Sequence, residues 1–242
     1  MIVVSMTSWT KRITYVKKVV ESIMNNTIQP DRVYLNLSET EFQGIQLPQG
    51  LVDYFNSDER LIINWVSGPN TKTMKKIFPI LKYLQDDDII IDADDDILFP
   101  KDLIESRLND FERNGRRYCI SSNTHTSVGF NGQMKVVSAI SLFQKKMLNH
   151  WQEFVTQAII DTNNDDRTYL YLIWLNGYLN KGCTKWDIFI LLEQYDMKLD
   201  NPISKKSSDF KGGMIYDRVA QNEFNRITNK NVIDSFGIYG RY

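Results

Sequence analysis

The sequence contains few of the residues that cross-link small secreted proteins or bind zinc. It has only two cysteines, Cys119 and Cys183, and only two histidines, His125 and His150. Two cysteines provide neither a disulfide framework nor a four-ligand zinc site by themselves. This scarcity favours a reduced, cytoplasmic compartment.

The sequence also lacks a long apolar run and a sizeable net charge. No stretch approaches the roughly 18 apolar residues of a membrane span, and residues 1–8 lack the regions that make up a signal peptide. Lysine and arginine number 29 against 30 aspartates and glutamates, so the net charge is −1. No global field favours a nucleic-acid partner, and electrostatic binding must therefore come from local clusters.

The length and composition are those of an ordinary globular protein. Of the 242 residues, 42% are apolar and 24% are charged, which is enough to build a substantial core. The sequence shows no internal repeat and no linker long enough to separate two folding units. We therefore expect a single domain over residues 1–242.

Short β-branched segments alternate with helical patterns over the first hundred residues. Strands are expected at residues 2–6, 33–37, 61–65 and 89–91. Thr7, Ser8 and Thr10 are expected to cap the helix that follows the first strand. A second helical stretch covers residues 74–81, and Pro79 is expected to kink it or to start another turn. This order predicts a doubly wound, mostly parallel α/β sheet flanked by helices.

The second half of the sequence is less regular, and five further elements are expected there. They are a helix over 100–115, a strand over 118–122, a strand or hairpin arm over 134–143, a helix over 168–179 and a helix over 214–227. Residues 121–132 and 162–166 are polar and are expected to be loops. Tyr169, Leu170, Ile173 and Trp174 recur at helical spacing, which is typical of a core-facing helix.

An unusually acidic segment carries the strongest functional signal. Ile89-Ile90-Ile91 reads as a buried strand, and Asp92-Ala93-Asp94-Asp95-Asp96 follows it directly. Four carboxylates in one turn repel one another, so a proton or a cation must compensate them. Mg²⁺ or Mn²⁺ would suit these oxygen ligands. The alternative is a solvated acidic turn or helix start, where aspartate is common.

The position of this acidic segment in the predicted sheet also indicates a binding site. Ligands of doubly wound sheets bind beyond the carboxyl ends of the strands. Residues 5–9, 38–39, 67–72 and 92–96 all lie at such ends, so we expect them to converge on one crevice. Topology brings Lys72, Lys75 and Lys76 to the same edge, where a lysine can contact phosphate, although solvated surface lysines are an equally simple interpretation.

Spacing tests the familiar alternatives. An EF-hand loop counted from Asp92 would need glycine and glutamate where Ile97 and Leu103 stand, so that interpretation fails. A metal-dependent phosphatase or phosphotransferase that uses Asp92 and Asp94 remains open. Its haloacid-dehalogenase-type pattern, however, has Thr or Val at the position of Asp96. The sequence has no Gly-x-Ser-x-Gly, Walker A or Gly-x-Gly-x-x-Gly motif, so hydrolase, kinase and dinucleotide-binding interpretations lack support.

Taken together, these segments resemble GT-A-fold glycosyltransferases, and the sequence is similar to bacterial enzymes of glycosyltransferase family 2. The segments that carry the resemblance are Val3-Val4-Ser5-Met6-Thr7-Ser8-Trp9, the Pro30-Asp31 turn, the acidic turn ending in Ile97-Leu98-Phe99-Pro100, and Asp165-Asp166. The resemblance implies that residues 1–100 bind a nucleotide sugar. Residues 101–242, the more irregular half, would then bind the acceptor and carry the catalytic residues.

The resemblance also implies roles for individual residues. Asp94 and Asp96 would bind Mn²⁺ or Mg²⁺, with Asp95 beside the donor, although Asp92-Ala93-Asp94 is an equally good Asp-x-Asp motif. The nucleotide-sugar side would include Thr7, Ser8, Trp9, Arg12 and Glu39, in addition to Lys72 and Lys76. Asp166 would be the general base, with Asp165 as its partner or substitute. Helix N-capping is the alternative role for this acidic pair.

The implied reaction is metal-dependent transfer of a hexose or an N-acetylhexosamine, with inversion, from a UDP-linked donor. The acceptor would be a hydroxyl of a bacterial surface glycan, free or lipid-linked. A lipid-linked acceptor would bring the protein to the inner face of the membrane as a peripheral protein, where Lys205-Lys206 and Arg241 could touch anionic lipid. A non-catalytic sugar-binding module on the same fold is the remaining alternative.

Overall fold

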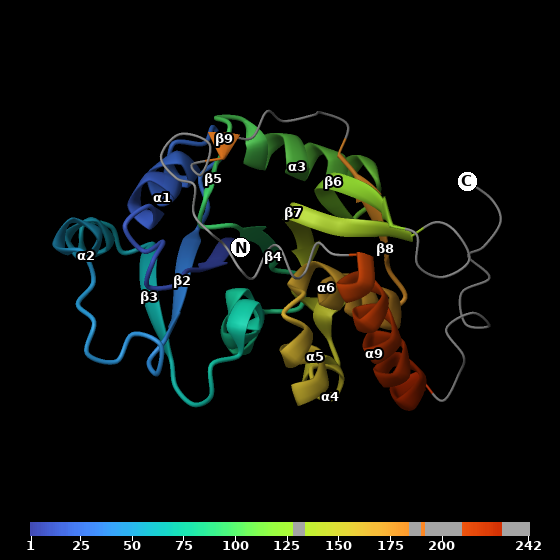
Figure 1. The fold of residues 1–242 in the computed structure, drawn as a ribbon. Coiled ribbons are helices and arrows are strands. Elements are labelled where there is room, and N and C mark those ends of the chain that lie inside the picture. The colour runs from blue at the N-terminus through green and yellow to red at the C-terminus, as the bar shows by residue number, and fades with distance from the viewer. Residues whose placement is uncertain (128–133, 184–189, 192–209, 229–242) are drawn as a thin grey trace.

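The computed structural model describes residues 1–127, 134–183, 190–191 and 210–228. A seven-stranded sheet in the order β3-β2-β1-β4-β7-β6-β8 forms its centre (Figure 1). Its strands are β1 (Ile2–Thr7), β2 (Arg32–Ser38), β3 (Leu61–Val66), β4 (Ile89–Ala93), β6 (Tyr118–Ser127), β7 (Met134–Gln144) and β8 (Leu179–Gly182). A small second sheet pairs β5 (Ile97–Leu98) with β9 (Ile190–Leu191).

The first four strands of the sheet are parallel to one another. β1 pairs with β2 on one side and β4 on the other, and β2 pairs with β3. Every residue of β4 is buried, as expected for an apolar strand covered on both faces. β7 runs antiparallel to β4 and β6, whereas β6 and β8 are parallel. The predicted doubly wound, mostly parallel α/β sheet is confirmed.

Helices cover both faces of the sheet. They are α1 (Val16–Met24), α2 (Gln49–Asn56), α3 (Leu103–Arg113), α4 (Trp151–Phe154), α5 (Gln157–Thr162), α6 (Asp165–Leu175) and α9 (Phe210–Thr228). Three 3₁₀ helices are η1 (Lys72–Lys76), η2 (Phe78–Tyr83) and η3 (Lys145–Leu148). In Figure 1, α1 and α3 lie on one side of the sheet, and α5, α6 and α9 lie on the other.

Aromatic side chains join the first half of the chain to α6. Tyr169 is fully buried, and its ring centre lies 5.9 Å from that of Phe78 in η2 and 5.7 Å from that of Phe143 in β7. Phe78 in turn stacks on Trp151 at 5.0 Å. The predicted core face of α6 is thus confirmed, and the packing fixes where α6 begins relative to the sheet.

Two helix starts differ from expectation. α1 begins at Val16 with Tyr15 in the N-cap position and no side-chain cap, so Thr7, Ser8 and Thr10 do not cap it. Turns occupy residues 10–15, and Thr7 and Ser8 hydrogen-bond elsewhere. The expected helix over 74–81 is instead two 3₁₀ helices, and Pro79 lies in the first turn of η2, where its missing N–H costs nothing.

Three further elements differ in extent. Helix α2 was not predicted from the sequence. The loop expected from residue 121 is strand as far as Ser127, because β7 pairs with β6 along its length. α6 begins at Asp165 and ends at Leu175, and the predicted last turns of that helix are a bend followed by β8. Among the described residues, no helix is long and apolar enough to cross a membrane.

Candidate functional site

A cavity of about 310 Å³ opens where the loops after β1 and β4 meet η1 and the start of α6. The predicted site residues that line it are Thr7, Ser8, Trp9, Arg12, Lys72, Lys76, Asp94, Asp95 and Asp165. Five further residues complete the lining, and they are Glu41, Asn70, Thr73, Lys75 and Asn163. Glu39, Asp96 and Asp166 are not among the lining residues.

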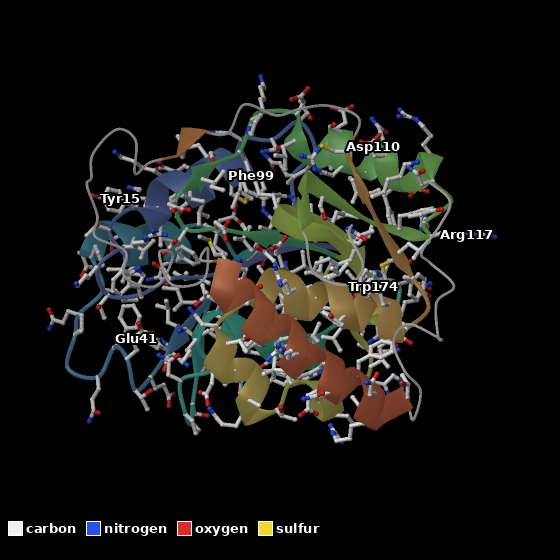
Figure 2. All side chains as sticks on the ribbon, turned by 45° about the vertical axis from the view of Figure 1, so that its right-hand side comes forward. Tyr15, Glu41, Phe99, Asp110, Arg117 and Trp174 are labelled. Atoms are coloured by element: carbon white, nitrogen blue, oxygen red, sulfur yellow. The ribbon has the colours of Figure 1, made fainter. Side chains whose placement is uncertain are left out.

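Glu41 lines the cavity, whereas Glu39, which the resemblance placed on the nucleotide-sugar side, does not. Glu39 is exposed, and its N–H donates to the carbonyl of Val66. The chain then turns, because the N–H groups of Glu41 and Phe42 both donate to the carbonyl of Ser38. The turn directs Glu41, labelled in Figure 2, back to the cavity, where its Oε2 accepts from Lys75 Nζ at 2.9 Å.

Lys75, the middle one of the three lysines that the sequence places at this edge, is buried rather than solvated. Its side chain is 5% exposed, and its ammonium also donates to Asn70 Oδ1 at 2.9 Å. Three lysines of η1 line the cavity as a result. The sequence indicates only that these lysines follow the third strand. It does not indicate that Lys75 is buried, because that burial depends on the turn that follows β2.

Arg12 compensates two of the four carboxylates of the acidic turn. Its Nη1 lies 3.0 Å from Asp95 Oδ1 and 2.8 Å from Asp96 Oδ2. Ser8 Oγ also donates to Asp95 Oδ2 at 2.6 Å. Burial raises the pKa of Asp96 to about 6, with the charge of Asp94 adding to this and Arg12 opposing it.

Asp92 belongs to the sheet rather than to the cavity. It is 1% exposed, and the backbone N–H of Ser141 on β7 donates to its Oδ1. Burial raises the pKa of Asp92 to about 7, although the nearby Lys76 lowers it. A side chain buried in this way is poorly placed as a phosphate-accepting nucleophile, which counts against the phosphatase interpretation built on Asp92 and Asp94.

Lys76 lies at the centre of the remaining carboxylates. Its Nζ donates to Asp94 Oδ1 at 2.7 Å and lies 2.7 Å from Asp165 Oδ2 and 3.9 Å from Asp92 Oδ2. Burial alone lowers the pKa of Lys76, but these three carboxylates outweigh it and hold the pKa well above its usual value. Lys76 likewise lowers the pKa of Asp94 against the effect of burial.

The acidic pair Asp165-Asp166 forms the first turn of α6. The N-cap is Asn164, whose side chain accepts the N–H of Arg167 at 3.1 Å, so neither aspartate is needed as the cap. Burial and the adjacent charge of Asp165 raise the pKa of Asp166 well above its usual value. Two carboxyl groups with different environments stand side by side, which suits acid–base chemistry.

The acidic centre fits a divalent cation if the ligand brings further oxygens. Within the described part of the chain, no group of three or more histidine, cysteine, aspartate or glutamate side chains is arranged to hold a metal ion. Mg²⁺, however, is commonly bound by one or two carboxylates together with substrate phosphates and water. Lys76 and Arg12 lie among more carboxyl groups than they can neutralise, so an added positive charge would be favourable.

Comparison with known proteins shows the fold. No protein-family model matches the sequence, and no curated protein matches it. The structure is similar to S. aureus TarS 1–349 in complex with UDP, with 9% identity and a TM-score of 0.56 over 99% of this chain and 75% of that one. Against the longer TarS chain, of which this chain covers 46%, the TM-score is 0.53.

A second solved structure gives the same result. Mannosyltransferase PcManGT from Pyrobaculum calidifontis, solved in complex with GDP-Man and Mn²⁺, is 12% identical with a TM-score of 0.54 over 100% of this chain and 76% of that one. TarS 1–349 has also been solved with UDP-GlcNAc, and the TM-score to that structure is 0.50. The GT-A-like glycosyltransferase fold that the resemblance implied is confirmed.

Proposed function

We propose that the protein is a glycosyltransferase that uses a nucleotide sugar as its donor. The observation that carries the proposal is a single cavity that combines the acidic turn after β4, the cationic side chains of η1 and the carboxylates at the start of α6. The similar structures support the donor class, because they were solved with UDP, UDP-GlcNAc and GDP-Man. UDP is our proposed nucleotide.

The donor would lie along the carboxyl end of β1 and against η1. Thr7, Ser8 and Trp9 would line the nucleoside side, and Arg12, Lys72 and Lys76 would face the diphosphate, with Lys75 beside them. Charge-assisted hydrogen bonds from such groups to phosphate are stronger than neutral ones. They also stabilise the negative charge that develops on the departing diphosphate.

Asp94 and Asp96 are the residues that would hold Mn²⁺ or Mg²⁺. Such an ion, when bound, neutralises negative charge on the diphosphate of the donor. Lys76 and Arg12 already pair with these two carboxylates, so the same pair of side chains would hold the acidic turn in position around the donor.

Asp166 is our candidate for the general base, with Asp165 as its partner. The acceptor hydroxyl would give its proton to the Asp166 carboxylate while the new bond from the acceptor oxygen to the sugar carbon forms. The bond from that carbon to the diphosphate breaks on the opposite face, and its electron pair leaves with the diphosphate. This sequence inverts the configuration at the sugar carbon. A carboxyl with a raised pKa is well suited to take up the proton.

The acceptor that we propose is a hydroxyl of a bacterial surface glycan, and the transferred group is a hexose or an N-acetylhexosamine. If the acceptor is lipid-linked, the protein would meet it at the cytoplasmic face of the membrane. Lys205-Lys206 and Arg241, which were predicted to touch anionic lipid, lie outside the described residues.

A screen of nucleotide sugars with Mn²⁺ or Mg²⁺ tests the proposal. Calorimetry would measure binding, and release of nucleoside diphosphate would measure turnover. We expect one donor to bind, and we expect Asp94→Asn to lose at least tenfold in affinity. Asp86→Asn is the matched control, since Asp86 lies before β4, pairs with Lys145 and is 62% exposed. Absence of binding by every nucleotide sugar with either metal would remove the proposal.

A further inference from the structure

Three neighbouring parallel strands carry a row of polar side chains inside the sheet. Ser5 of β1 and Asn36 of β2 are both 0% exposed, and Asn64 of β3 is half-buried. Burying an amide or a hydroxyl costs free energy unless its hydrogen bonds are made. Apolar side chains could fill these positions without this cost in free energy, so the hydrogen bonds of the row need an explanation.

The hydrogen bonds of the row converge on one main-chain atom, the carbonyl oxygen of Lys76. Ser5 Oγ donates to this oxygen at 2.5 Å, and Asn36 Nδ2 donates to it at 3.0 Å. Asn36 Nδ2 also donates to Ser5 Oγ at 2.9 Å. Asn64 Nδ2 donates to Asn36 Oδ1 at 2.7 Å, which fixes the orientation of the Asn36 amide.

The position of this carbonyl explains why it needs partners. Lys76 is the last residue of η1, and the final carbonyls of a helix have no partner within the helix. The row therefore acts as a buried cap for the carboxyl end of η1. It fixes the point from which the Lys76 side chain extends.

The side chain of Lys76 is held as firmly as its backbone carbonyl. Its side chain is 7% exposed, and its ammonium bridges Asp94 on the donor side and Asp165 on the acceptor side. Lys76 is thus attached by its backbone to β1 and β2, and through Asn36 indirectly to β3, while its side chain contacts both halves of the site. A shift at the carbonyl would be transmitted to the ammonium, because little space remains for another rotamer.

We propose that Asn36 is a positioning residue for the transfer reaction and that it acts through Lys76. The row of Ser5, Asn36 and Asn64 holds the Lys76 backbone so that its ammonium keeps Asp94 and Asp165 in register. The catalytic part of this inference rests on the proposed function. A displacement of about 1 Å in such a group can cost roughly a hundredfold in rate, whereas the loss of a purely structural bond would only lower stability.

Asn26 provides a matched control within the same protein. It is 4% exposed, its Nδ2 donates to the carbonyl of Ser22 at 3.0 Å, and its Oδ1 accepts from the N–H of Ile104 at 3.1 Å. It therefore links α1 to α3 by buried amide bonds, as Asn36 links the sheet to η1, but it does not line the cavity. Asn26→Ala and Asn36→Ala should lose similar amounts of stability.

The first measurement does not depend on activity. A buried, ion-paired lysine ammonium exchanges its protons slowly enough to be seen by ¹H–¹⁵N NMR, and the signal that is missing in Lys76→Met identifies Lys76. We expect that signal to shift or disappear in Asn36→Ala and to stay unchanged in Asn26→Ala. An unchanged signal in Asn36→Ala, its loss in both asparagine variants, or its absence from the wild type would overturn the proposal.

The second measurement is a double-mutant cycle of turnover with the donor found in the screen. We expect Asn36→Ala to lower kcat at least tenfold, Asn26→Ala to leave it within twofold, and Asn36→Ala in the Lys76→Met background to add nothing. Additive losses would contradict action through Lys76.

If Asn36→Ala does not fold, Ser5→Ala removes the other donor to the same carbonyl. If the wild type turns over no nucleotide sugar, the proposed function fails, and the ammonium signal still decides the positioning role.

Discussion

The two halves of the chain build the cavity in different ways. The first half provides the segments that follow its parallel strands, namely residues 7–12, 41, 70–76 and 94–95. In the second half β7 runs antiparallel to its neighbours, and among the described residues of this half Asn163 and Asp165, at the start of α6, line the cavity. Binding surface therefore comes from strand ends, and the candidate base comes from a helix start.

The halves also differ in the charge that they contribute. The cationic residues of the lining, Arg12, Lys72, Lys75 and Lys76, all belong to the first half. The second half adds a carboxylate and meets the first along η1, where Lys76 contacts Asp165, Lys72 lies 3.4 Å from Asp161, and Thr73 donates to Asn163. Donor affinity and proton transfer should consequently respond to different substitutions.

The largest effect should follow from Asp166→Asn. Removal of a general base typically lowers turnover by about 10² to 10⁴. We expect kcat to fall by that amount while UDP affinity, which depends on cations of the first half, changes less than threefold. Steady-state kinetics and calorimetry measure the two quantities. Asp87→Asn is the control, as Asp87 is 78% exposed and pairs with Lys146, and neither residue lines the cavity. Full activity of Asp166→Asn would remove its role as base.

Next in size is the loss of stability expected for Arg12→Met. This change leaves the buried Asp95 and Asp96 without their cation, and breaking a buried pair costs about 3 kcal/mol or more. Urea unfolding measures it. The loss should shrink at pH 5, because the pKa of Asp96 is already raised to about 6 and its protonation removes one uncompensated charge.

Arg60→Met provides the contrast for Arg12→Met. Arg60 pairs with Asp58 at 2.6 Å at the surface, where such a pair contributes at most about 1 kcal/mol. If the two variants lose equal stability, the buried pairs of Arg12 do not hold the acidic turn in the way that the structure indicates.

A smaller effect is the pH dependence of turnover. The pKa of Asp166 is raised, so its carboxyl is protonated at low pH and cannot take the proton of the acceptor. We expect kcat to rise with pH, by up to about tenfold per unit below that pKa, and to level off above it. This rise of kcat with pH should be absent from the residual activity of Asp166→Asn. If kcat of that variant rises over the same pH range with the same slope, the titrating group is not Asp166.

The smallest effect concerns the two thiols, both of which belong to the second half. Cys119 on β6 is 0% exposed, and burial raises the pKa of its thiol to about 12, so it should not react with Ellman's reagent in the folded protein. Cys183, after β8, is half-buried and should react slowly. We expect one reactive thiol per native chain and two after unfolding. Two reactive thiols in the native protein would show that β6 opens more readily than its packing suggests.

The parts of the fold that sequence predicts well are those set by local pattern. The β-branched run Ile89-Ile90-Ile91 favours a buried strand, and the carboxylates that follow such a strand are expected at the edge of the sheet. The core face of α6 was likewise visible in the spacing of Tyr169, Leu170 and Ile173. The spacing of apolar residues along one element is a local property, and it predicts which face of that element is buried.

The parts that sequence reasoning missed depend on long-range contacts. Arg12 meets Asp96 across 84 positions, and Asn36 reaches the Lys76 carbonyl across 40, so no local pattern assigns these partners. Glu41 lines the cavity and Glu39 does not, because the chain turns after β2 through two hydrogen bonds to the Ser38 carbonyl. Strand β6 runs past the predicted loop because its pairing with β7, not its composition, determines its end.

Asn163 illustrates how one backbone angle can restrict which sequences this fold accepts. It ends α5 in the left-handed region, with φ of 51°, and its Oδ1 accepts from both the N–H and the hydroxyl of Thr73 at 3.3 Å. Glycine would keep the backbone and lose both bonds, whereas a β-branched residue would strain the backbone. Few residue types other than asparagine can therefore keep both the backbone conformation and the contact with Thr73 at position 163.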